Sequence, residues 1–244
     1  MMGMPITVDV VDRSARSQDI AEIFSYFDAV DRRFSTYKQE SEISRINRGE
    51  IAPEAYSQDM KTVFALCDET KHMTNGFFDI VRRDGSRDPS GLVKGWAIRE
   101  AAGLLKAFAY ENFFIDAGGD IQVFGTNVSG RPWSIGIKNP FNQSQIVQVV
   151  YPQGAGVATS GTYIRGQHVY NPRAKHAPIT DIVSLTVIGP DIYEADRFAT
   201  AAFSMGREGI AFIESLDGFE GFMIDKDGMS IATSKFRMYT QSPV

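Results

Sequence analysis

The sequence predicts an α+β fold, with helices packed on a largely antiparallel or mixed β-sheet. Segments whose apolar residues recur at helical spacing are interspersed with short segments of alternating or continuous apolar residues, which are typical of strands. Several strand segments follow one another directly, which favours hairpins over parallel βαβ units. The 244 residues contain no repeats, low-complexity tracts or Pro/Ser-rich linkers. We therefore expect residues 1–244 to form a single domain, or two closely packed halves of one.

The composition excludes several classes of protein. A hydrophobic content of 43% and a charged content of 23% are those of an ordinary globular protein, and the net charge of −5 argues against a general nucleic-acid-binding protein. Cys67 is the single cysteine, which excludes a disulfide framework and a thiolate zinc cluster. The N-terminus has no signal-peptide pattern, and no apolar run has membrane length. We expect a cytoplasmic protein with no membrane segment.

The first elements are a strand and two helices. Residues 5–12 alternate as a short strand does. Ser17 is expected to cap a helix whose apolar residues recur at helical spacing. These apolar residues are Ile20, Ile23, Phe24, Phe27, Val30 and Phe34. A hydroxyl-rich stretch, residues 34–47, separates this helix from a second one, which should run from about Ser57 to His72 and stop near Gly76.

The central stretch, residues 83–95, reads R-D-G-S-R-D-P-S-G-L-V-K-G. Residues 88–91 have turn chemistry, and the apolar spacing after Gly95 predicts an amphipathic helix. A glycine-containing loop and Lys94 would then lie at a helix N-terminus, where unpaired N–H groups favour an anion. An ordinary loop–helix junction explains the same residues. The stretch lacks the G-x-x-x-x-G-K-[ST] pattern of a P-loop.

The remaining chain alternates strands and helices. The predicted strands cover residues 113–115, 121–124, 133–137, 146–151 and 183–188. Asp191 and Glu194 have the spacing of a capping box, so a helix should begin there and end at Gly206. A further helix is expected over residues 207–216, followed by a hairpin that turns at Asp227-Gly228. The stretch 154–161 is rich in small residues, which allow the backbone to approach a ligand or another chain segment closely.

Asp196 and Thr200 are the best candidates for metal ligands. They lie at i and i+4 of a predicted helix, so a carboxylate and a hydroxyl share one flank. Mg²⁺ prefers oxygen ligands of this kind. Gly91 could add its backbone carbonyl, because a glycine allows an ion near the main chain. The alternative interpretation is a surface aspartate and a threonine at the edge of the core.

Three further segments could bind a ligand or catalyse a reaction. Residues 116–120, D-A-G-G-D, could bind a ligand or simply turn the chain between two strands. Residues 159–161, T-S-G, could form a backbone nest for a phosphate or another simple turn. His168 is the most plausible general base, because histidine titrates near neutral pH, although a structural role is the alternative.

Seven ordered motifs together resemble the FAD:protein FMN transferases, the ApbE-like flavin transferase family. The motifs are F-S-T-Y-K-Q-E-S-E-I-S-R-I-N (34–47), G-F-F-D (76–79), D-P-S-G-L-V-K-G-W-A (88–97), I-D-A-G-G-D-I (115–121), A-T-S-G (158–161), H-V-Y-N-P-R (168–173) and A-D-R-F-A-T-A (195–201). The resemblance implies an α+β fold and a Mg²⁺-dependent enzyme. Such an enzyme transfers the FMN half of FAD to a threonine or serine of an acceptor protein and releases AMP.

The resemblance also assigns residues to the expected site. The Mg²⁺ ligands would be Asp196, Thr200 and the Gly91 carbonyl, and the catalytic residues would be His168 and Lys94. The expected FAD contacts, including the two glycine-containing loops described above, are Tyr37, Asn47, Phe77, Phe78, Asp79, Asp88, Lys94, Asp116, Gly118, Gly119, Thr159, Ser160 and Val169. The expected partners are FAD and an acceptor protein, and no nucleic acid is expected.

Several departures from the family pattern leave two alternatives open. Met4 follows Met2-Gly3 where the family usually has threonine, and the segment between Asp79 and Asp88 is short. Asn171 stands where the family prefers aspartate, and residues 174–176, A-K-H, replace the usual Thr-Gly. One alternative is a Mg²⁺-dependent FAD pyrophosphatase, in which water replaces the acceptor hydroxyl. The other is a flavin-binding protein without catalytic activity.

Overall fold

The centre of the fold is a seven-stranded sheet. The computed structural model describes residues 3–162, 169–174 and 176–242. Within them the sheet has the order β1-β2-β3-β6-β9-β10-β11, and each neighbouring pair is antiparallel. Its strands are β1 (Ile6–Val10), β2 (Phe113–Ala117), β3 (Asp120–Phe124), β6 (Gly156–Gly161), β9 (Ile182–Gly189), β10 (Glu220–Asp225) and β11 (Ser230–Ala232). The predicted α+β class with an antiparallel sheet is confirmed.

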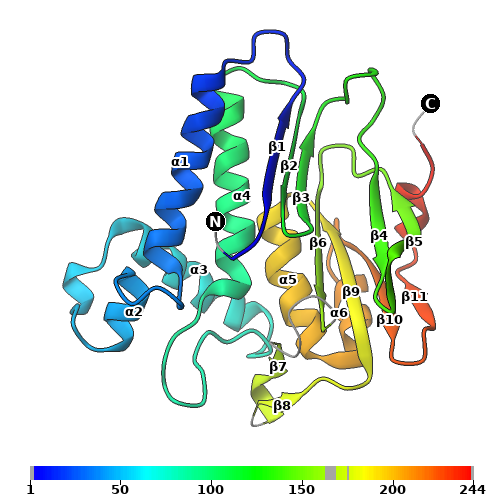
Figure 1. Cartoon of the computed structure of the whole chain (residues 1–244). Helices are drawn as coiled ribbons and strands as arrows, with labels where there is room; N and C mark the ends of the chain where they lie inside the picture. Colours follow the sequence, from blue (N-terminus) through cyan, green and yellow to red (C-terminus); the bar gives the residue numbers. More distant parts are fainter. Residues whose placement is uncertain (1–2, 163–168, 175, 243–244) are drawn as a thin grey trace.

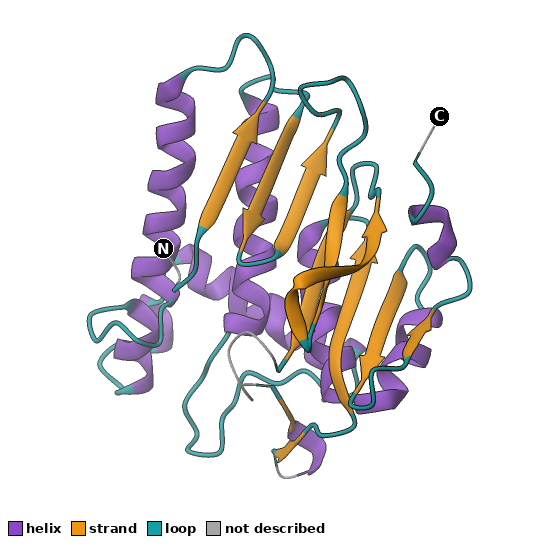
Figure 2. Ribbon diagram, turned by 45° about the vertical axis from the view of Figure 1, so that its right-hand side comes forward, coloured by secondary structure: helices purple, strands orange, loops and turns teal. Residues whose placement is uncertain are grey.

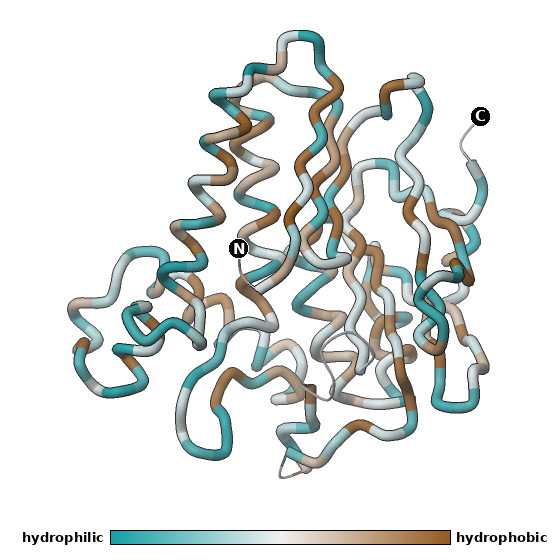
Figure 3. Tube along the Cα trace, in the orientation of Figure 1, coloured by the Kyte–Doolittle hydropathy of each residue, from teal (hydrophilic) through white to brown (hydrophobic). Residues whose placement is uncertain are grey.

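Helices cover one face of this sheet (Figure 1, Figure 2). The helices of the described residues are α1 (Ser17–Phe34), α2 (Glu42–Asn47), α3 (Gln58–Met73), α4 (Ser90–Ala107), α5 (Ile192–Ser204) and α6 (Gly209–Glu214). Of these, α4, α5 and α6 pack on the strands, whereas α2 packs on α1 and α3 packs on α4. Helix α4 packs between α1 and α5, and α5 lies against β6 and β9. Hydrophobic segments follow the sheet and the helix faces turned toward it, whereas the outer loops are hydrophilic (Figure 3). Burial of this apolar layer is the main stabilising contribution to the fold.

Two small hairpins lie outside the main sheet. The first joins β4 (Ile135–Asn139) to β5 (Asn142–Val150) and crosses the sheet face opposite the helices (Figure 2). Its buried residues Ile135, Ile137 and Val150 form a second apolar cluster with Ile121 and Val157 of the sheet. The second hairpin pairs β7 (Tyr170–Asn171) with β8 (Ala177–Pro178), with the short 3₁₀ helix Pro172–Ala174 between them. Further 3₁₀ helices are Pro53–Ala55, Gly206–Glu208 and Phe236–Tyr239.

The start of α4 differs from the prediction. The helix begins at Ser90, inside the stretch predicted to be a turn and before the expected start after Gly95, with Pro89 as its N-cap residue. The Asp88 side chain accepts the Ser90 N–H over 3.1 Å, which satisfies a backbone donor that the helix itself leaves open. The turn chemistry of Asp88-Pro89 therefore initiates the helix. Gly91 and Lys94 lie in its first two turns, not in a preceding loop.

Other element boundaries also differ in detail. Ser17 is the first residue of α1 and Arg16 is the cap position, without a side-chain cap bond. The hydroxyl-rich stretch contains the unpredicted helix α2, whose cap residue Ser41 accepts the Ser44 N–H. Asp191 caps α5 by accepting the Glu194 N–H, but the Glu194 carboxylate pairs with Arg197, so only half of the capping box forms.

The expected helix over residues 207–216 is divided. A 3₁₀ helix, Gly206–Glu208, comes first and α6 follows it. Within the described residues, no helix combines the length and the apolar character that a membrane crossing requires.

Candidate active site

Two glycines of α4 allow it to approach α5 closely. A Cβ atom on Gly91 would lie 3.0 Å from Thr200 Cγ2, and one on Gly95 would lie 2.6 Å from Asp196 Cβ. The Cβ atom on Gly95 would also lie 2.7 Å from the Ile192 carbonyl oxygen. Because residues four apart lie on the same face of a helix, the two glycines together form the contact surface. At Gly95 no larger residue fits without a shift of α5, and at Gly91 the Thr200 side chain would have to give way by a few tenths of an ångström.

This close contact brings the predicted metal-ligand residues together. The Thr200 hydroxyl donates a hydrogen bond to the Gly91 carbonyl oxygen over 3.2 Å. The Gly95 N–H donates to Asp196 Oδ2 over 2.8 Å. Gly91, Asp196 and Thr200 all line one small pocket of about 120 Å³. The carbonyl, hydroxyl and carboxylate oxygens predicted from separate motifs therefore face one space.

A buried charge cluster lies beside these oxygens. Lys94 Nζ forms an ion pair with Asp120 and lies 3.8 Å from Asp196 Oδ1. The Lys94 side chain is 16% exposed, while those of Asp120 and Asp196 are 1% and 4% exposed. The other Asp120 oxygen, Oδ1, accepts the Thr159 N–H over 3.1 Å. The pair of carboxylates thus shares the ammonium of Lys94.

The donor set fits a hard divalent cation. Carbonyl, hydroxyl and carboxylate oxygens are the ligands that Mg²⁺ takes in proteins. Burial raises the pKa of Asp196 above its ordinary range. The nearby Lys94 ammonium opposes this increase in the pKa, and the Asp120 carboxylate adds to it. When both buried carboxylates are ionised, one ammonium leaves an excess of negative charge, and a bound cation would neutralise it and favour the ionised form of Asp196. Gly91, Asp196 and Thr200 are therefore the residues that could hold such an ion.

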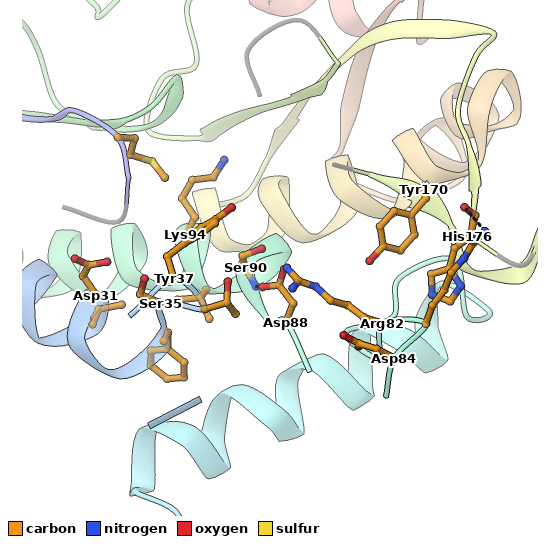
Figure 4. A pocket seen from close by; sticks show the side chains of 16 residues that line it. Asp31, Ser35, Tyr37, Arg82, Asp84, Asp88, Ser90, Lys94, Tyr170 and His176 are labelled. Carbon is orange, nitrogen blue, oxygen red and sulfur yellow. Dashed lines mark hydrogen bonds and ion pairs between the residues drawn. The ribbon is translucent and has the colours of Figure 1, made fainter. Parts of the chain in front are cut away.

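A larger pocket adjoins the small one. Its volume is about 630 Å³, within the range of pockets that bind cofactor-sized molecules. Asp88, Ser90, Lys94 and Tyr170 line both pockets, so the two spaces lie side by side with these residues between them. Figure 4 shows Lys94 and Ser90 on α4, with Asp88 and Arg82 between them and Tyr170. The Arg82 guanidinium forms an ion pair with Asp88.

Most of the predicted FAD-contact residues line these pockets. The small pocket contains Phe77, Phe78, Asp79, Asp88, Lys94, Gly118, Thr159, Ser160 and Val169. The large pocket contains Tyr37, Asp88 and Lys94, and the Tyr37 side chain there is 94% exposed. An elongated ligand with a polar middle section would fit this arrangement of one large and one small space.

Three predicted contacts lie outside both pockets: Asn47, Asp116 and Gly119. The Asn47 amide donates to the Arg87 carbonyl and accepts the Arg87 N–H, each over 2.9 Å. It fixes the segment that leads to Asp88 rather than facing the cavity. Asp116 accepts the Gly119 N–H over 2.7 Å and stabilises the turn between β2 and β3. His168, the predicted base, lies outside the described residues.

The structure adds residues to the site that the sequence interpretation left out. Asp120 and Gly95 contact the charge cluster directly, and Arg82, Tyr170 and His176 line the large pocket. The His176 and Tyr170 rings lie 4.8 Å apart between centroids, and both come from the β7–β8 hairpin. The four-residue spacing of Gly91 and Gly95 was the one available signal, since it marks a close helix contact. Asp120 lies in the stretch 116–120 that could bind a ligand or turn the chain, but nothing local in the sequence indicates its ion pair with Lys94 or distinguishes Arg82 and His176.

Comparison with known proteins identifies the family. The ApbE family model matches residues 2–86 and 81–223. The chain belongs to the ApbE family. A curated relative from Vibrio cholerae serotype O1, named FAD:protein FMN transferase, is 32% identical over 138 residues, which are 52% of this chain and 41% of the relative. A relative of the same name from Escherichia coli K12 is 30% identical over 155 residues, covering 60% of this chain and 44% of its own length. The alignments thus span less than half of these curated ApbE relatives.

Solved ApbE structures share the fold. The flavin transferase ApbE from Vibrio cholerae superposes with a TM-score of 0.85 at 25% identity, covering 97% of this chain and 96% of that one. The ApbE protein from Thermotoga maritima gives a TM-score of 0.84 at 20% identity, covering 98% and 97%. The antiparallel sheet with its helical layer is therefore the ApbE fold.

Proposed function

We propose that this ApbE-family protein transfers the FMN half of FAD to a threonine or serine hydroxyl of an acceptor protein and releases AMP. The observation that carries the proposal is the meeting of Gly91, Asp196 and Thr200 beside Lys94, in a pocket that adjoins a larger one. The names and structures of the relatives support flavin transfer. The structural match over 97% of this chain supports a single domain over residues 1–244.

The reaction requires stabilisation of phosphate charge. Gly91, Asp196 and Thr200 would hold Mg²⁺, which when bound supplies charge neutralisation at the pyrophosphate. Lys94 faces both pockets, and its ammonium is placed to contact a phosphate oxygen of a nucleotide in them. Tyr170 and the exposed Tyr37 provide ring surfaces in the large pocket against which a fused ring can pack.

The transfer itself exchanges one P–O bond for another. The acceptor hydroxyl oxygen forms a bond to the phosphorus of the FMN half, and the bond from that phosphorus to the AMP oxygen breaks. The hydroxyl proton passes to a base, for which we propose His168. Such a base accelerates the reaction by a factor of roughly 10²–10⁴. AMP leaves with the bridging oxygen, so atoms and charge balance.

Incubation with FAD and Mg²⁺ tests the proposal and separates it from its alternatives. Chromatography would follow AMP and free FMN, and mass spectrometry would follow candidate acceptor proteins co-expressed with this chain. AMP together with covalently attached FMN supports transfer. AMP with free FMN in equal amount supports a pyrophosphatase instead. FAD binding without AMP, in the presence of Mg²⁺ and acceptor, would show a flavin-binding protein that does not catalyse transfer. Omission of Mg²⁺ or addition of a chelator should abolish AMP release.

A further inference from the structure

Asp120 is a buried carboxylate next to, but not among, the proposed metal ligands. It begins β3, directly after the Gly118-Gly119 turn, and its side chain is 1% exposed. Oδ1 accepts the Thr159 N–H from β6, which fixes the carboxylate to the neighbouring strand. Oδ2 forms the ion pair with Lys94 and, within the described residues, accepts no conventional hydrogen bond. Oδ2 is therefore turned toward the ammonium, and the Asp196 carboxyl group is a further close neighbour of the Asp120 side chain.

Lys94 needs such a partner because its side chain is flexible. A lysine ammonium is a compact charge at the end of a flexible four-carbon chain. Unlike the planar guanidinium group of arginine, it does not fix the direction of its own hydrogen bonds. Asp196 Oδ1 lies 3.8 Å from Lys94 Nζ, close enough to attract it. If the ammonium moved fully onto Asp196, it would compete with a divalent cation for that carboxylate and leave the junction of the two pockets.

We propose that Asp120 is a positioning residue that holds the Lys94 ammonium at the junction of the two pockets, facing the phosphates of the bound nucleotide. The proposal rests on the proposed function and specifies how one of its residues is kept in place. Asp120 acts through Lys94 and does not itself contact the reacting phosphorus. Its effect on FAD should therefore disappear when Lys94 is absent.

A double-mutant cycle tests this dependence. Asp120→Asn keeps the shape and an acceptor oxygen for the Thr159 N–H, but removes the charge that holds Lys94. Lys94→Met removes the ammonium and keeps an unbranched apolar side chain of similar length. Each variant and the double variant are assayed with FAD and Mg²⁺ for AMP release, and with FAD in the presence of a chelator for binding by calorimetry.

We expect Asp120→Asn to lower kcat/KM for FAD about 10- to 100-fold, as loss of an orienting contact does. The KM for FAD should rise as well, because Lys94 contacts the phosphates in the ground state too. In the Lys94→Met background the same change should alter kcat/KM and the binding constant by less than about twofold. Asp225→Asn is the matched control: a buried strand aspartate paired with Arg207 over 2.6 Å and outside both pockets. It should leave kcat/KM unchanged.

The outcomes separate the two proposals. If the Asp120 and Lys94 effects multiply in the double variant, Asp120 does not act through Lys94 and the positioning proposal is overturned. It is also overturned if only kcat falls while KM and binding stay constant, because Asp120 then does not hold Lys94 against the phosphates of bound FAD. If the unmodified protein neither binds FAD nor releases AMP, the proposed function itself fails, and the positioning proposal with it. Thermal unfolding shows which variants fold. If Asp120→Asn does not fold, Asp120→Ser replaces it in the double-mutant cycle.

Discussion

The backbone N–H of Gly95 donates a hydrogen bond to Asp196 Oδ2 over 2.8 Å, across the contact of α4 with α5. This bond orients a carboxylate whose side chain is only 4% exposed. It exists because Gly95 has no side chain, since a Cβ there would lie 2.6 Å from Asp196 Cβ. The geometry of the proposed metal site therefore depends on a residue that offers no functional group.

Gly95→Ala should destabilise the fold and disturb the site. The added methyl group meets the Asp196 Cβ and the Ile192 carbonyl, so α5 must move away, at a cost of about 1–3 kcal/mol in the free energy of unfolding. Denaturant unfolding measures this change, and Mg²⁺-dependent AMP release should fall as well. Gly103→Ala, on the same helix with open space around its Cβ position, should stabilise the protein by about 0.5–1 kcal/mol. Equal effects at both glycines would contradict the close-contact interpretation.

Thr200→Val should weaken divalent-cation binding while preserving the packing of α5. Valine has nearly the same shape but lacks the hydroxyl that donates to the Gly91 carbonyl. We expect AMP release at limiting Mg²⁺ to fall by about 100-fold, as when one group that stabilises transition-state charge is removed, with partial recovery at high Mg²⁺. Titration of activity with Mg²⁺ measures the shift. Thr7→Val, on the exposed side of β1, is the control and should leave the titration unchanged.

Cys67 should be unreactive in the folded protein. Its side chain is 2% exposed within the core, and burial raises the pKa of the thiol, so little thiolate forms near neutral pH. A chromogenic disulfide reagent should therefore label no thiol under native conditions and one thiol per chain after denaturation. Rapid labelling of the native protein would place Cys67 outside the core.

Asp19 should contribute to stability at neutral pH and lose that contribution in acid. A side-chain hydrogen bond from Arg16, followed by one from the Tyr110 hydroxyl, lowers the pKa of Asp19 below its ordinary value of 3.8. Since the folded-state pKa is depressed, the stabilisation is fully present above the ordinary value and disappears as the pH falls through the folded-state value. Thermal unfolding from pH 6 down to about pH 2 should show a smaller decrease for Asp19→Asn than for the unmodified protein.

The periodicity of the sequence predicted most strands and the longer helices well, because these elements bury one continuous apolar face. It missed the central strand β6 (Gly156–Gly161): the prediction of a nest or turn at residues 159–161 was wrong, because small residues carry no alternating apolar pattern. The start of α4 was misplaced since Asp88-Pro89-Ser90-Gly91 has equally good residues for a turn and for a helix N-terminus. Helix α2 was missed because it has six residues, of which only Ile43 and Ile46 are buried. Local residue propensities do not distinguish a turn from a helix N-terminus at residues 88–91, or a loop from a short helix at residues 42–47.

The site was predictable only where its residues lie in motifs. Asp196 and Thr200 share a helix flank, and Gly91 precedes Lys94 by three residues, so their pairing could be proposed from spacing and resemblance. Asp120 lies in the motif 115–121, but its contact with Lys94 depends on the order of strands in the sheet, and His176 reaches the large pocket through a hairpin. Such long-range contacts leave no periodic trace in the sequence.

The contact between Gly91 and Thr200 joins parts of the chain that are 109 positions apart. A growing polypeptide that has left the ribosome only as far as β9 already contains Lys94 and Asp120, yet it has neither Asp196 nor Thr200. The proposed metal site is therefore incomplete during synthesis until α5 has emerged and docked on α4, and the proposed reaction would have to wait until this late helix joins the early one.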